Sequence, residues 1–96
     1  MTDTFLRDTP YATEIATAAV GEVRIERIHV KAEGQDEIRF SWWPDGKMAN
    51  RPLDIPEHTL LSLFDQAMQQ RIFTQRFLED LHILLARRAR FANVGR

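Results

Sequence analysis

Two adjacent tryptophans close the alternating stretch EIRFSWW, residues 37–43. Successive side chains of a strand point to opposite faces, so Trp42 shares a face with Ile38 and Phe40. Trp43 then points to the other face. We therefore expect Trp42 in the core and Trp43 at the surface.

Cations accompany Trp43 on its predicted face. Arg39 has the same parity in the strand, and Lys47 and Arg51 follow the tight turn at Pro44. An exposed aromatic ring can stack a nucleobase while cations on the same surface contact phosphates. This surface is therefore a candidate nucleic-acid-binding site. In the alternative interpretation, Trp43 lies over the tight turn or under the N-terminal segment and covers apolar surface, and aromatic–arginine pairs stabilise the sheet without a ligand.

A second group of cations follows near the end of the sequence, comprising Arg87, Arg88, Arg90 and Arg96 around Phe91. Arginines beside an aromatic residue can bind nucleic acid or an acidic partner, so these residues join the candidate nucleic-acid-binding set. The alternative is structural. Cations near the C-terminus of a helix interact favourably with its exposed carbonyls and dipole, typically by about 0.3–1 kcal/mol each.

The order of elements over residues 38–64 is an antiparallel meander, a tight turn, a further strand and a helix opened by the pair Pro56-Glu57. This order is loosely similar to that of a family of single-stranded-DNA-binding coactivators. The resemblance implies nucleic-acid binding on the sheet. The chain departs from that family in lacking its lysine- and glycine-rich strands and in adding a second helix.

Metal binding is not expected. Glu79 and His82 have the E-x-x-H spacing of carboxylate-bridged di-metal bundles, but such sites need a second E-x-x-H and two further glutamates. His29 falls in a predicted strand and His58 in the first turn of a predicted helix, so the three histidines share no motif.

Catalysis is equally unsupported, and we expect no enzyme activity and no cofactor. Ser41 and Ser62 are the only serines, and neither lies in a nucleophile-elbow motif. The four glycines form no phosphate-binding loop, and the absence of cysteine excludes thiolate chemistry.

The length of 96 residues predicts a single domain over residues 1–96, with a start, residues 1–14, that is expected to fray. A chain of this size buries only about 60–65% of its unfolded surface, so dimerisation would add burial that a monomer lacks. The sequence begins without a secretory signal pattern and has no apolar run near the ~20 residues of a membrane helix. We expect a cytoplasmic protein that does not enter a membrane.

Alternation predicts strands over residues 22–32, 37–43 and about 47–53, with a β-bulge at Glu26-Arg27 where the apolar parity of the first strand switches. Residues 10–19 fit a short helix capped by Thr9 and a strand about equally. The result is an antiparallel β-meander of three to four strands.

The apolar period then becomes helical. Asp54 and Pro56 mark the start of a first helix, and Thr74 can cap a second that runs to about Arg88. Each helix carries one apolar stripe, from which Ile83 falls away. The predicted fold class is therefore α+β, with the meander followed by a two-helix hairpin packed on one face.

The function expected from these features is that of a small non-enzymatic protein-interaction module that self-associates, as a homodimer, or binds a protein partner through the Ile83 side of the second helix. The first alternative is nucleic-acid binding through the Trp43 surface and the C-terminal arginines. The second is an inhibitor or immunity-type protein that blocks a larger enzyme, which fits the size and the net charge of −1.

Overall fold

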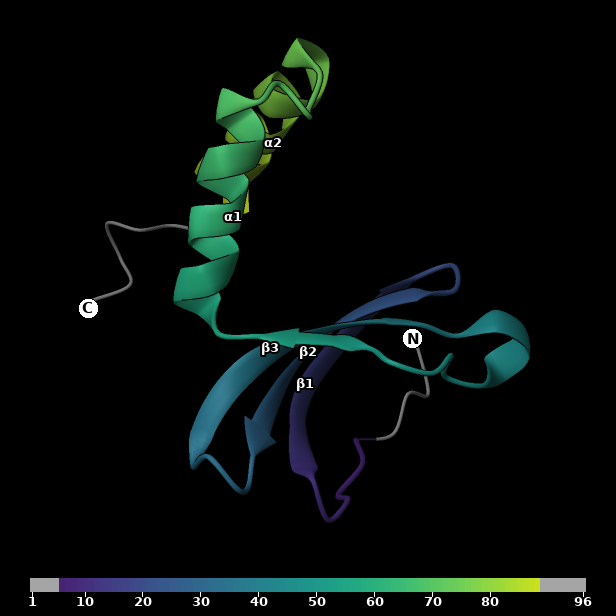
Figure 1. Cartoon of the computed structure of the whole chain (residues 1–96). Helices are drawn as coiled ribbons and strands as arrows, with labels where there is room; N and C mark the ends of the chain where they lie inside the picture. Colours follow the sequence, from purple (N-terminus) through teal and green to yellow (C-terminus); the bar gives the residue numbers. More distant parts are fainter. Residues whose placement is uncertain (1–5, 89–96) are drawn as a thin grey trace. The chain divides into compact units, whose positions relative to one another are not determined.

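A four-stranded antiparallel sheet occupies the first part of the chain. The computed structural model describes residues 6–88, and its strands β1 (Ala12–Val20), β2 (Val23–Val30), β3 (Gln35–Trp42) and β4 (Leu53–Ile55) lie in the order β1-β2-β3-β4 (Figure 1). Two helices follow. The predicted α+β class, a β-meander and then two helices, is confirmed. Packing of the helices on one face of the sheet stays a prediction, and the chain divides into two compact units, Met1–Leu61 and Ser62–Arg96.

Of the two alternatives for residues 10–19, the strand is correct. Alternating β-branched residues in β1, Thr13, Ile15 and Thr17, suit a pleated strand better than a helix. Gly21 takes φ 60° in the two-residue turn to β2, a conformation that favours glycine.

The predicted bulge lies in a different strand. Pairing of β2 with β3 is unbroken through Glu26 and Arg27, whereas the pairing of β1 with β2 shifts between Glu14 and Ala16. The parity switch in β2 has another cause, because the strand carries apolar residues on both faces. Ile28 and Val30 are buried on one face, while Val23 and Ile25 on the opposite face are exposed.

The buried face of the sheet is small and mostly polar. Among the described residues, the apolar cluster on this face consists of Ala12, Ile28 and Val30. Five polar or charged residues of the sheet are also buried, namely Glu14, Glu26, Glu37, Arg39 and Ser41. Buried charges are costly unless they are paired, so these residues must find partners within the fold.

The third predicted strand, residues 47–53, is displaced toward the helix. Residues 44–46 form a 3-10 turn (η1, Pro44–Gly46), and β4 starts only at Leu53. Asp45 and Arg51 both have positive φ, which interrupts an extended ladder, and Pro52 has no N–H to donate. Lys47 and Arg51 consequently lie in an irregular connection.

The helices are α1 (Glu57–Gln69) and α2 (Gln75–Arg88), close to their predicted bounds. Thr74 caps α2 as predicted, because its Oγ1 accepts a hydrogen bond of 3.1 Å from the backbone N–H of Phe77. Arg71 ends α1 in a left-handed conformation, φ 57°, with Ile72 N–H donating back to the carbonyl of Ala67. Asp54 is not a cap, since it belongs to β4.

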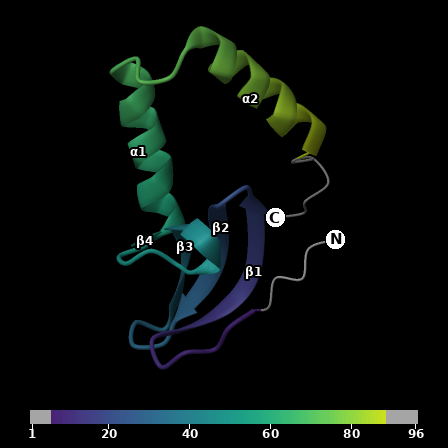
Figure 2. The ribbon, with the colours of Figure 1, turned by 90° about the vertical axis from the view of Figure 1, so that its right-hand side faces the viewer.

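The connection between the helices is packed around aromatic rings. Phe73 lies 5.4 Å from Phe64 and 4.9 Å from Phe77, measured between ring centroids. Beyond this cluster the two helices diverge (Figure 2). Neither described helix has the length and apolar character required to cross a membrane.

Candidate interaction surfaces

Trp42 is not a core residue. It shares a face with Ile38 and Phe40 as predicted, but its side chain is 55% exposed. Its indole N–H donates to the carboxylate of Glu22 at 3.3 Å, which holds the ring beside its cross-strand neighbour Val23. Alternation predicted the correct face, but that face is open around Trp42, whereas Ile38 on the same face is only 8% exposed.

Trp43 lies on the opposite face and is half-buried. The guanidinium of Arg24 lies 3.6 Å from the ring centroid and that of Arg7 lies 5.3 Å from it, both within cation–π range. The indole N–H donates to Ser41 Oγ at 2.9 Å. Sequence reasoning missed Arg24, although strand register would have placed it opposite Ser41.

Arg39 is engaged within the sheet. Its Nε and Nη2 donate to the two carboxylate oxygens of Asp54 at 2.7 and 2.9 Å, and the side chains of both residues are largely buried. This bidentate geometry is among the stronger protein ion pairs. The hydrogen bonds to Asp54, with the charges of nearby acidic groups, raise the pKa of Arg39, so its guanidinium stays charged. The guanidinium is therefore turned toward Asp54 and shielded from solvent.

The other predicted phosphate contacts are spread over several segments. Lys47 and Arg51 are exposed in the connection between β3 and β4, and Arg87 and Arg88 are exposed in the last turn of α2. Arg90 lies outside the described residues. None of these cations is within cation–π range of Trp43 in the part of the chain that is described, where its neighbours are Arg24 and Arg7.

Two buried carboxylates lie on the face that carries Trp43. Glu14 accepts hydrogen bonds of 2.8 Å from the backbone N–H and from Nε of Arg7. Glu26, only 2% exposed, accepts from the Thr17 hydroxyl at 3.2 Å, and its Oε1 has no hydrogen-bond partner among the described residues. Burial, reinforced by the nearby charge of Glu14, raises the pKa of Glu26. This face is thus a polar layer in which Glu14 and Arg39 are paired and Glu26 is only partly satisfied.

The opposite side carries an apolar sheet face, which we define by its exposed members Val20, Val23, Ile25, Trp42 and Leu53. Cross-strand pairing makes these residues neighbours, because Val23 pairs with Val20 and with Trp42, and Phe40 joins Ile25 to Leu53. A row of large apolar side chains that spans four strands is typical of a surface that contacts another protein element.

The helices also expose apolar side chains. Neither α1 nor α2 contains a buried residue. The second compact unit starts at Ser62. We define the hairpin surface by the exposed large apolar residues of this second unit, which are Leu63, Met68, Ile72, Phe77, Ile83, Leu84 and Leu85. An amphipathic helix gains most of its stability from burying such residues.

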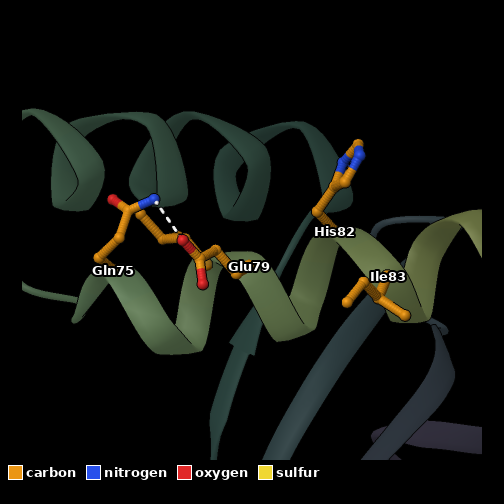
Figure 3. A pocket seen from close by; sticks show the side chains of 5 residues that line it. Gln75, Glu79, His82 and Ile83 are labelled. Atoms are coloured by element: carbon orange, nitrogen blue, oxygen red, sulfur yellow. Dashed lines mark hydrogen bonds between the residues drawn. The ribbon is translucent and has the colours of Figure 1, made fainter.

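Ile83, for which a partner contact stays a prediction, is exposed on α2. It is 54% exposed and lines a shallow groove on α2 with Gln75, Leu78, Glu79 and His82 (Figure 3). Within the groove Gln75 donates to Glu79 at 3.3 Å. Over residues 6–88, no group of three or more His, Cys, Asp or Glu side chains could hold a metal ion.

Comparison with known proteins gives no assignment: no family model, curated protein or solved structure matches the chain.

Proposed function

We propose that the chain is a small non-enzymatic interaction module that self-associates through the hairpin surface. The observation that carries this proposal is that both helices are strongly amphipathic and yet contain no buried residue. Apolar surface is also present away from the main stripe, at Ile83, so a single neighbouring element would not cover it.

The helices expose a substantial apolar area. Each of the seven side chains of the hairpin surface is between 42% and 68% exposed. A standard-size interface buries about 800 Å² per partner, including its polar rim. Ile83, Leu84 and Leu85 are consecutive on α2 and point in different directions, so a homodimer would bury the part of this area that lies on one side of the helices.

The first experiment is to measure the molar mass of the full chain by light scattering over a range of micromolar concentrations. We expect a mass above the 11.2 kDa of one chain. Leu63→Glu should lower this mass, because it places a charge within the hairpin surface that would be desolvated on association. A monomeric wild-type chain at high micromolar concentration would contradict the proposal.

Gln66→Glu is the matched control. Gln66 is exposed on the same helix, one turn from Leu63, and is not part of the hairpin surface. It receives the same charge, so it should leave the mass unchanged. Circular dichroism should show equal helix content in both variants, since Leu63 is already 54% exposed in the single chain.

Tryptophan fluorescence separates this proposal from nucleic-acid binding. We expect no saturable quenching by a mixed single-stranded oligonucleotide, because Arg24 covers a face of Trp43 and Arg39 is bound to Asp54. The titration should be made at low and at moderate salt. Quenching that saturates and weakens steeply with salt would instead favour stacking with phosphate contacts.

A further inference from the structure

The outer edge of β1 is covered for only part of its length. Residues 7–9 run along its first part, where Glu14 N–H donates to the carbonyl of Arg7 and Thr9 N–H donates to that of Ala12. The bulge at Ile15 follows this covered part. Beyond it, no described residue forms a backbone hydrogen bond to the outer edge of residues 16–20.

The open part of this edge has none of the usual protection against pairing. Edge strands are normally short, or carry charged residues or proline. Residues 15–20, IATAAV, contain no charge and no proline, and apart from the half-buried Thr17 they are all exposed. The other edge strand, β4, has only three residues. The edge of β1 is therefore the longer of the two and is chemically unprotected.

We propose that residues 16–20 of β1 pair antiparallel with the same residues of a second copy, which would join two four-stranded sheets into one of eight strands. This inference rests on the strand edge and not on the hairpin surface. A segment without charge presents no repulsion to its own copy, and the net charge of −1 leaves little long-range repulsion between chains.

The arrangement of apolar residues favours a second copy of the chain as the partner that pairs with the open edge of β1. Ala18 and Val20 point to the apolar sheet face, since they pair with Ile25 and Val23. A two-fold axis normal to the sheet makes the new pair antiparallel and keeps the apolar sheet faces of both copies on one side. Each chain therefore extends the apolar sheet face of the other without a break.

The test uses Leu63→Glu as the background, so that association through the hairpin surface is removed. This variant should remain a dimer by light scattering. Adding Ala18→Lys should weaken the dimer at least tenfold, because a lysine on an edge strand opposes pairing. Adding Ala32→Lys should leave it intact, because Ala32 is exposed in the turn after β2 and receives the same charge.

The outcomes distinguish the two proposals. A monomeric Leu63→Glu chain, or a dimer unaffected by Ala18→Lys, overturns pairing at β1 and leaves the hairpin proposal standing. A wild-type mass that is unchanged by Leu63→Glu but reduced by Ala18→Lys overturns the hairpin proposal and supports β1 pairing. A wild-type chain that is monomeric throughout overturns both.

Cysteine cross-linking locates the pair directly, since the chain has no native cysteine. Single cysteines at positions 17, 18 and 19 should give one maximum of disulfide-linked dimer under mild oxidation, at the residue nearest the two-fold axis. Directly paired strand residues have Cα atoms about 4.5–5.5 Å apart, within disulfide range. Yields no higher than that of Ala32→Cys, in the exposed turn after β2, would count against pairing.

Discussion

Replacement of Arg39 by methionine is expected to lower the free energy of unfolding by about 3–5 kcal/mol. The methionine fills much of the space of the arginine side chain but leaves the Asp54 carboxylate without its two hydrogen bonds of 2.7 and 2.9 Å. Asp54 is largely shielded from water, so its charge would remain uncompensated. Urea denaturation at one fixed protein concentration measures the effect.

Two variants make this prediction specific. Arg27→Met removes a partly exposed arginine that pairs with Asp36 and Glu57, and it should cost less than about 1 kcal/mol. Adding Asp54→Leu to Arg39→Met should recover most of the loss, because no unpaired charge is then left buried. If Arg27→Met and Arg39→Met lower the free energy of unfolding equally, the burial of the Arg39–Asp54 pair does not increase its contribution to stability.

Replacement of Glu26 by glutamine is expected to stabilise the fold at neutral pH by on the order of 1 kcal/mol, because a neutral amide is less costly to bury than a carboxylate. Burial raises the pKa of Glu26 in the folded chain, so the neutral carboxyl is favoured there. Its contribution to stability is present below the ordinary glutamate pKa and is lost as pH rises through the raised value. Glutamine is neutral at every pH and avoids this loss.

The measurement is the difference in unfolding free energy between Glu26→Gln and the wild type from pH 4 to pH 8. That difference should grow with pH, whereas groups common to both chains cancel, including Asp8 and Asp36, whose lowered pKa values give the opposite slope. Glu79→Gln removes one carboxylate from the exposed surface of α2 and serves as the control. If the unfolding free energies of Glu26→Gln and wild type change in parallel with pH, the pKa of Glu26 is not raised by folding.

Local sequence signals predicted the elements well. The cap at Thr74, the start of α1 near Pro56 and the opposite orientation of Trp42 and Trp43 all follow from chemistry within a few residues. The structure departs from expectation where the outcome depends on segments far apart in the chain. Trp42 was expected in the core because its face is apolar, but whether a face is covered is a tertiary property.

The pairing of the buried polar residues likewise depends on segments that are far apart in the sequence. Arg39 and Asp54 are 15 residues apart, and they meet only because β4 pairs with β3 over three residues. The parity of the strands places Glu26 and Arg39 on one face, which the sequence could reveal. It could not reveal that this face is the buried one, since apolar composition favours the opposite face.

The charged residues on the buried face also help to determine the register in which the strands pair. Sliding a strand by one residue would transfer its side chains to the other face of the sheet. For β3, such a slip would separate Arg39 from Asp54 and place its guanidinium among Val23, Ile25 and Leu53. Hydrophobic contacts alone would not prevent this shift in register, because β2 carries isoleucine and valine on both of its faces. Ionic partners at fixed positions make the misaligned sheet the costlier state, so charge selects one alignment where hydrophobicity alone would permit two.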